Sequence, residues 1–123
     1  MPVAERELTR LTGRAPAATL RAQADGSLVV EVPELALPAG WSLPRTTVRW
    51  VLSAGYPAAQ PDCFFADAEL RLATGAMPIN SGLQELQGRQ LLWFSWHIQG
   101  WRPGHDDLVS YLRFIESRLA DVR

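Results

Sequence analysis

Two residues with a clear capacity for chemistry, Ser95 and His97, stand two positions apart near the C-terminal third of the chain. A serine hydroxyl attacks a carbonyl only when a nearby base accepts its proton, and histidine changes charge closest to neutral pH. If residues 90–97 are extended, both side chains leave the same face of the strand. Ser95 could then hold an acyl group as an oxyester with His97 as base, or His97 alone could deprotonate an attacking amine. In the structural alternative, Ser95 bonds the backbone and His97 satisfies a buried polar partner.

The only cysteine, Cys63, lies between Asp62 and Phe64. Apolar burial and a neighbouring carboxylate would both raise the pKa of this thiol and suppress the reactive thiolate. We therefore expect a core residue and keep Cys63 as a weaker catalytic candidate. One cysteine and two histidines offer no CxxC, HxxxH or HxxE spacing for zinc, so we expect no structural metal and no cofactor.

Charge and hydropathy exclude several classes of protein. The 123 residues carry a net charge of −1, and all twelve positive side chains are arginines without a dense basic run, which argues against nucleic-acid binding. No segment approaches the roughly 20 apolar residues of a membrane span, and the N-terminus lacks the pattern of a secretory signal. We expect a cytoplasmic protein with a single domain over residues 1–123.

The N-terminal half predicts a helix followed by strands. Apolar residues at helical spacing indicate a helix over about residues 3–12, which Gly13 would end in a left-handed conformation. Two β-prone runs, 19–23 and 28–32, flank an Asp-Gly turn and predict a hairpin. The run from Thr46 to Leu52 alternates and reads as a half-buried strand, with Val48, Trp50 and Leu52 on one face and Thr47, Arg49 and Val51 on the other.

The C-terminal half predicts less regular structure before a final helix. Residues 63–65 could form a short strand, and residues 73–89, rich in Gly, Asn and Gln, suggest a long irregular excursion. The last helix would begin at a cap formed by Asp106 or His105. One apolar stripe packs it on the sheet: Leu108, Leu112, Ile115 and Leu119. This order of elements is that of an α+β domain.

That order of elements, with Gly55-Tyr56-Pro57 and Pro61, resembles the ubiquitin-conjugating fold, in which a Tyr-Pro and a later proline close a β-meander before the active-site segment. Trp101-Arg102-Pro103 and the helix after it are similar to the Trp-x-Pro and helix that follow the catalytic cysteine there. Over residues 36–120 the resemblance is closer to a bacterial branch, carried by Leu37-Pro38-x-Gly40, Pro61-Asp62-x-Phe64, Gly75 with Pro78, Gly88-Arg89, Ser95-x-His97, Trp101-Arg102-Pro103-Gly104 and Asp107-x-x-x-Tyr111-Leu112.

The resemblance implies a fold made of an N-terminal helix, an antiparallel meander, an irregular active-site segment and a C-terminal helix. Trp101 and Pro103 would position that segment. The chain departs from the family where the catalytic cysteine is expected, because Trp93 stands there and residues 64–123 hold no cysteine. The family's His-Pro-Asn is reduced to Met77-Pro78-Ile79-Asn80, which leaves Asn80 as a weak candidate for stabilising an acyl-transfer oxyanion.

Two functions follow from this resemblance. In the first, the chain accepts the C-terminus of a ubiquitin-like modifier from an activating enzyme and transfers it to a target, with Ser95 as an oxyester carrier. In the second, it is a non-catalytic module that binds the modifier or the activating enzyme. The bacterial branch also implies a JAB-type peptidase as an associated partner and a link to antiphage defence.

Overall fold

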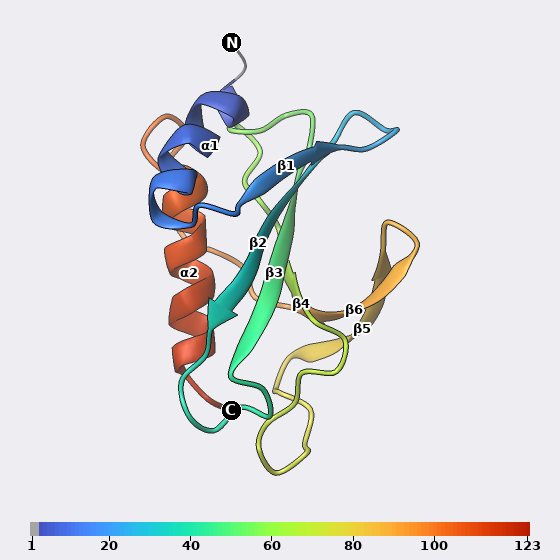
Figure 1. The fold of residues 1–123 in the computed structure, drawn as a ribbon. Coiled ribbons are helices and arrows are strands. Elements are labelled where there is room, and N and C mark those ends of the chain that lie inside the picture. The colour runs from blue at the N-terminus through green and yellow to red at the C-terminus, as the bar shows by residue number, and fades with distance from the viewer. Residues whose placement is uncertain (1–2) are drawn as a thin grey trace.

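The computed structural model describes residues 3–123 as two helices and one antiparallel sheet (Figure 1). The elements are α1 (Val3–Arg14), β1 (Thr19–Ala22), β2 (Leu28–Ala36), β3 (Arg45–Leu52), β4 (Phe64–Ala66), β5 (Ser81–Leu86), β6 (Arg89–Phe94) and α2 (Leu108–Ala120). The strand order is β1-β2-β3-β4-β6-β5. Both helices lie on one side of the sheet, and the β5–β6 hairpin extends away from them. The α+β class is confirmed; Met1 and Pro2 of the expected domain lie outside the described residues.

The first three strands form the predicted meander. β1 and β2 pair around a turn in which Gly26 has a φ of 88°, and the Asp25 carboxylate accepts a hydrogen bond of 2.9 Å from the Ser27 amide. This is the chemistry that makes Asp-Gly a hairpin signal. In β3, Val48, Trp50 and Leu52 are buried against the helices, as their alternation predicted.

The core lies between the helices and one face of the sheet. Phe64 of β4 and Phe94 of β6 are adjacent in register, and their rings stack with centroids 4.7 Å apart. The predicted stripe of α2, from Leu108 to Leu119, is buried against this face. The N-cap of α2 is Asp107 rather than Asp106 or His105, because its carboxylate accepts from the Ser110 amide in a capping box.

Two further sequence expectations about local structure were wrong. Helix α1 runs through Gly13 to Arg14, because Gly13 keeps an ordinary φ and the Ala15 amide still bonds the Leu11 carbonyl at 2.7 Å. The expected excursion at 73–89 contains strand β5 and the start of β6, which meet at Gln87 and Gly88, both with positive φ. The alternation in β5 is weak because none of its residues is buried and Leu83, Gln84 and Glu85 are exposed in succession, so it gave no strand signal.

Arg118 fastens the C-terminal residues to the chain that leads into β5. It is 2% exposed, and its guanidinium donates to the carbonyls of Ile79 at 3.2 Å and Arg123 at 3.0 Å. The same group lies 5.0 Å from the ring centroid of Trp96, the residue before His97. The end of α2 therefore supports the segment that follows β6.

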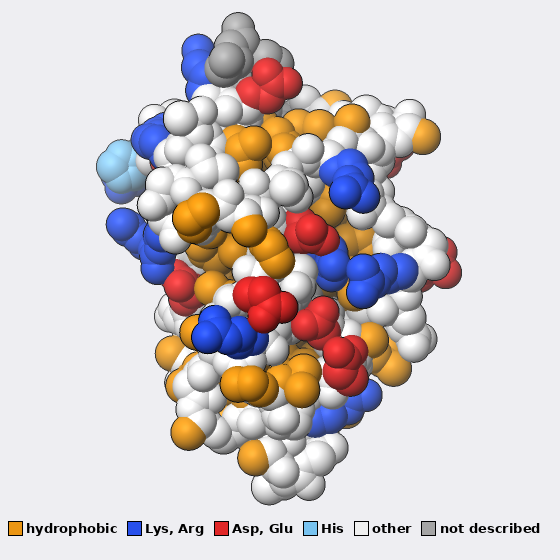
Figure 2. Space-filling view, in the orientation of Figure 1, with side chains coloured by type: hydrophobic (Ala, Val, Ile, Leu, Met, Phe, Trp, Pro, Cys, Tyr) orange, Lys and Arg blue, Asp and Glu red, His pale blue; other side chains and the backbone are white. Residues whose placement is uncertain are grey.

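The surface carries charges of both signs. In Figure 2, acidic and basic side chains are interspersed across the visible face, and neither sign gathers into a continuous patch. No helix among residues 3–123 is long and apolar enough to cross a membrane.

Candidate functional site

The segment that holds Ser95 and His97 leaves the sheet earlier than the sequence suggested. Strand β6 ends at Phe94, and the Trp96 amide donates to the Phe94 carbonyl at 3.0 Å in a tight three-residue turn. The condition that residues 90–97 are all extended, on which a shared face for Ser95 and His97 depended, is therefore not met. Alternation along a strand no longer places Ser95 and His97 on one face, and the structure shows no hydrogen bond between their side chains among the described residues.

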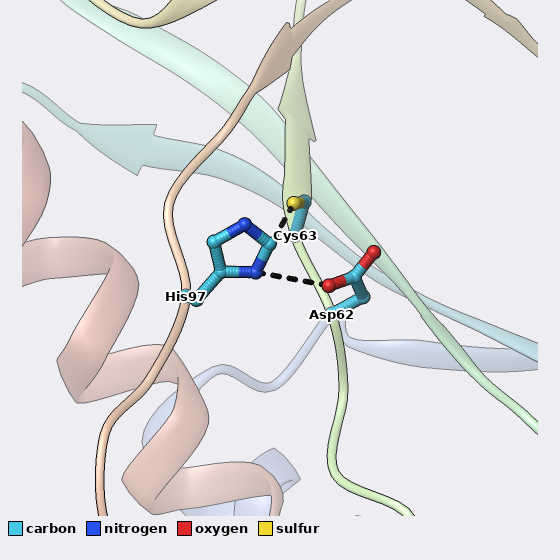
Figure 3. A group of neighbouring side chains, drawn as sticks. All are labelled: Asp62, Cys63 and His97. Carbon is cyan, nitrogen blue, oxygen red and sulfur yellow. Dashed lines mark hydrogen bonds and ion pairs between the residues drawn. The ribbon is translucent and has the colours of Figure 1, made fainter.

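His97 pairs instead with Asp62, which precedes β4. Its Nδ1 lies 2.9 Å from Asp62 Oδ1 (Figure 3). The two side chains are 51% and 86% exposed, so the pair is open to solvent. The sequence also allowed that His97 satisfies a buried polar partner. This alternative is wrong, because both His97 and its partner Asp62 lie at the surface.

The Asp62 contact decides which ring nitrogen of His97 is free. A carboxylate holds the proton of the neutral imidazole on the nitrogen that faces it, here Nδ1, so that Nε2 keeps its lone pair. An imidazole oriented in this way is a general base whose partner acid also stabilises the imidazolium that forms. The arrangement is an acid–histidine dyad with its basic nitrogen available to a reactant.

Cys63 is close to this dyad but is poorly placed to use it. Its Sγ is 3.9 Å from His97 Nδ1, the same nitrogen that Asp62 occupies, whereas a thiol activated by histidine needs the other nitrogen. The residue is 6% exposed, and burial, aided by the charge of Asp62, raises the pKa of its thiol. The thiolate that would act as a nucleophile is therefore disfavoured.

A small surface cavity lies beside the dyad. It has a volume of about 240 Å³ and is lined by Val51, Asp62, Cys63, Phe65, Gln84 and Trp93. Trp93, the residue that the resemblance predicts at the position of the conjugating enzymes' cysteine, pairs in register with Phe65 on β4. That position thus contributes an indole wall to the cavity.

Asn80 and Ser95 are joined through the backbone. The Ser95 amide donates to the Asn80 carbonyl at 2.8 Å, while Asn80 itself is exposed with a φ of 55°. Ser95 is half-buried, and its hydroxyl makes no hydrogen bond with residues 3–123, so the expected bond from this hydroxyl to the backbone is not seen. Asn80 directly precedes β5 and Ser95 directly follows β6, so both lie at the open end of this hairpin, two residues before His97 in the case of Ser95.

Trp101 holds the far end of the same segment. Its indole Nε1 donates to the Pro57 carbonyl at 2.9 Å, and its ring lies 5.9 Å from that of Tyr56. Pro103 forms an isolated β-bridge with Asp106 just before α2. These contacts join the chain after His97 to the Tyr-Pro turn that leads to Asp62.

The Tyr56 side chain of this turn bonds a buried carboxylate, Glu7, that the sequence did not reveal. Glu7 of α1 is 6% exposed and accepts hydrogen bonds from the Tyr56 hydroxyl and, at 3.1 Å, from the Leu108 amide at the start of α2. Burial raises the pKa of Glu7, and burial together with Glu7 raises the pKa of the Tyr56 phenol. No local sequence pattern reveals the role of Glu7, because its partners are distant in the chain.

Asp62 is the site residue that sequence reasoning missed. It was noted only as the neighbour of Cys63 and within the motif Pro61-Asp62-x-Phe64, and nothing in the spacing brought it to His97. The position of Asp62 just before β4 was a usable signal. An acidic residue that precedes a central strand can face the residues that follow the antiparallel neighbouring strand. β4 and β6 are such neighbours.

A meander with two helices on one face, a Tyr-Pro turn and a Trp-x-Pro segment before the last helix place the chain in the ubiquitin-conjugating class. The family model described as prokaryotic E2 family E matches residues 17–122, and the chain belongs to this family. The family supports a role in ubiquitin-like conjugation, with a modifier and an activating enzyme as partners in general. The comparisons with curated proteins and with solved structures gave no match.

Proposed function

We propose that this chain is the transfer component of a bacterial conjugation pathway, accepting the C-terminus of a ubiquitin-like modifier from the activating enzyme and passing it to a target amine. The observation that carries the proposal is the Asp62–His97 pair, 2.9 Å apart and open to solvent at the end of the sheet. General-base catalysis requires a base that can reach the attacking group, and the solvent-exposed imidazole of His97 can offer Nε2 to such a group without a thiol on this chain.

In the form of the reaction that uses a carrier, Ser95 is the first acceptor. Its Oγ attacks the carbonyl of the modifier's thioester, His97 Nε2 takes the hydroxyl proton, and the activating enzyme's thiol leaves. The imidazolium supplies the proton of that departing thiol. The target amine then attacks the resulting oxyester while Nε2 takes the amine proton, and the alkoxide of Ser95 receives this proton from the imidazolium as the amide forms. The free hydroxyl of Ser95 supports this role, and Asn80 next to it supplies a candidate amide donor for the oxyanion.

The same base also serves a direct route. Here the target amine attacks the thioester while the modifier is still on the activating enzyme, and His97 removes the amine proton. Cys63 is the weaker third acceptor, since its thiol is buried and shares Nδ1 with Asp62.

The alternative function is a binding or scaffold module for the modifier or the activating enzyme. The observation in its favour is Trp93, which fills the position of the family's cysteine with a half-buried indole. In either case we place the protein in the cytoplasm, with a JAB-type peptidase as the enzyme that reverses conjugation and antiphage defence as the setting.

The test mixes the purified chain with its activating enzyme, the modifier and ATP, and follows adducts on denaturing gels. We expect an adduct that resists thiol reductant, is cleaved by hydroxide and disappears in Ser95→Ala. Persistence of transfer to the target in Ser95→Ala, together with its loss in His97→Ala, would identify the direct route.

The outcomes separate the candidates. An adduct that yields to reductant and is lost in Cys63→Ala assigns the carrier role to the thiol. If an activating enzyme that demonstrably charges itself gives neither adduct nor transfer, the binding module is the function. His105→Ala is the matched control, because His105 is the other histidine and is exposed in the loop before α2.

A further inference from the structure

Three different metal-ligating groups meet beside the cavity: the carboxylate of Asp62, the thiol of Cys63 and the imidazole of His97 (Figure 3). One ligand atom from each lies within 4.8 Å of the other two. Local spacing could not reveal this set, because His97 is 34 residues from Cys63. The expectation of no metal rested on such spacing.

Two of the three separations are close to those of a tetrahedral zinc site, and the third, between the Asp62 oxygen and the Cys63 sulfur, is at most 4.8 Å. Zinc bonds of about 2.0–2.3 Å to oxygen, nitrogen and sulfur place any two ligand atoms about 3.3–3.6 Å apart. Here Nδ1 is 2.9 Å from the Asp62 oxygen and 3.9 Å from the Cys63 sulfur. Shifts of a few tenths of an ångström in these two distances fit the geometry, and the exposed side chains of Asp62 and His97 leave an entry path.

We infer that Asp62, Cys63 and His97 form a binding site for a borderline-soft divalent cation, zinc above all, with water as the fourth ligand. Mixed sulfur, nitrogen and oxygen ligands favour zinc over magnesium or calcium, which prefer oxygen alone. Three protein ligands and an open fourth position give a site that loads and unloads from solution.

Metal binding changes the protonation of the dyad. The thiol proton of Cys63 is released to solvent, because only the thiolate ligates zinc. His97 must present the lone pair of Nδ1 to the metal, so its ring proton moves to Nε2. The Asp62-paired and metal-bound imidazoles are thus opposite tautomers, and only the first has a basic Nε2. A bound metal therefore switches off the base, a consequence that rests on the proposed function.

Cobalt titration of the full chain tests the site without any partner. Co²⁺ takes the same ligands as Zn²⁺ and reports a thiolate by a near-ultraviolet charge-transfer band and a tetrahedral site by intense visible bands. We expect both at one equivalent, with Zn²⁺ abolishing them. The charge-transfer band should vanish in Cys63→Ser, and affinity should fall at least about 10-fold in His97→Ala.

His105→Ala is the matched control and should bind cobalt like the parent chain. The inference is overturned if no charge-transfer band forms with excess cobalt, if Cys63→Ser keeps the band, or if His105→Ala loses as much affinity as His97→Ala. Because His97 is half-exposed, its variant tests the site even if Cys63→Ser does not fold. In the transfer assay, Zn²⁺ should stop the reaction and a chelator should restore it. Failure of transfer without zinc would contradict the proposed function and leave the cobalt result standing.

Discussion

Two carboxylates have opposite surroundings: Glu7 of α1, which bonds the loop between β3 and β4, and Asp62, which lies in that loop. Glu7 is 6% exposed and is bonded to the Tyr56 hydroxyl and the Leu108 amide, whereas Asp62 has an 86% exposed side chain and a single partner, His97. The buried group joins three segments of the fold, because each of its partners would otherwise be unpaired. The open group contributes little to stability and keeps its histidine available. The difference separates a structural carboxylate from a functional one.

The largest effect is expected at the open pair. His97→Ala should slow transfer of the modifier about 100-fold or more, since it removes a positioned base. Its free energy of unfolding should change by less than about 1 kcal/mol, because an exposed ion pair contributes little. Single-turnover transfer assays and urea unfolding measure the two quantities. If His97→Ala instead lowers the free energy of unfolding by much more than about 1 kcal/mol, the open pair is structural as well, and the two carboxylates do not differ in the way described.

Next in size is the effect of removing the buried carboxylate. Glu7→Ala leaves the Tyr56 hydroxyl and the Leu108 amide without their acceptor, and should lower the free energy of unfolding by about 2–4 kcal/mol. Urea unfolding followed by tryptophan fluorescence measures this change. Glu5→Ala, on an exposed position of the same helix, is the control and should change stability by less than about 0.5 kcal/mol. Equal effects of the two variants would refute the role assigned to Glu7.

A smaller effect is expected at Trp101, which joins the segment after His97 to the turn that contains Tyr56. Trp101→Phe keeps the ring beside Tyr56 but loses the hydrogen bond to the Pro57 carbonyl, which should cost about 1 kcal/mol of stability. Thermal unfolding checks this value, with Arg102→Ala as an exposed neighbour for comparison. A variant as stable as the parent chain would mean that the bond does not hold the segment.

The smallest effect is a pH dependence. Because burial raises the pKa of Glu7 above its ordinary 4.5, the folded protein holds this proton more tightly than the unfolded chain. The stabilisation from Glu7 is fully present below 4.5 and is lost as the pH rises through the folded value. Relative to Glu7→Gln, which cannot titrate, the parent chain should therefore lose stability as the pH rises above the ordinary value of 4.5. Urea unfolding at several pH values measures the difference, and a parent chain that gains stability over this range would give the wrong sign.

The parts of the fold that the sequence predicted are those with strong local patterns. β3 was predicted because Val48, Trp50 and Leu52 alternate, and α2 because its stripe repeats at helical spacing. β5 was missed because none of its residues is buried, which removes the alternation that burial imposes. Its turn at Gln87 and Gly88 needs positive φ at a glutamine, which no turn rule favours.

The candidate site could be predicted only in part. The resemblance led to His97, because the motif places it in the segment before Trp101. The partner of His97 depends on how β4 and β6 pair and on where β6 ends, and these are tertiary facts. The same limit applies to Glu7, whose carboxylate bonds Tyr56 and Leu108 across the core.

The absence of lysine has a further consequence for chemistry at this site. The cations in the ion pairs formed by Arg10, Arg14, Arg49 and Arg123 are guanidinium groups, so these contacts present no nucleophilic nitrogen. Within these 123 residues, no side chain offers an ε-amine to an activated carboxyl group. The chain can therefore stand beside a reactive acyl donor without an isopeptide bond forming on its own side chains.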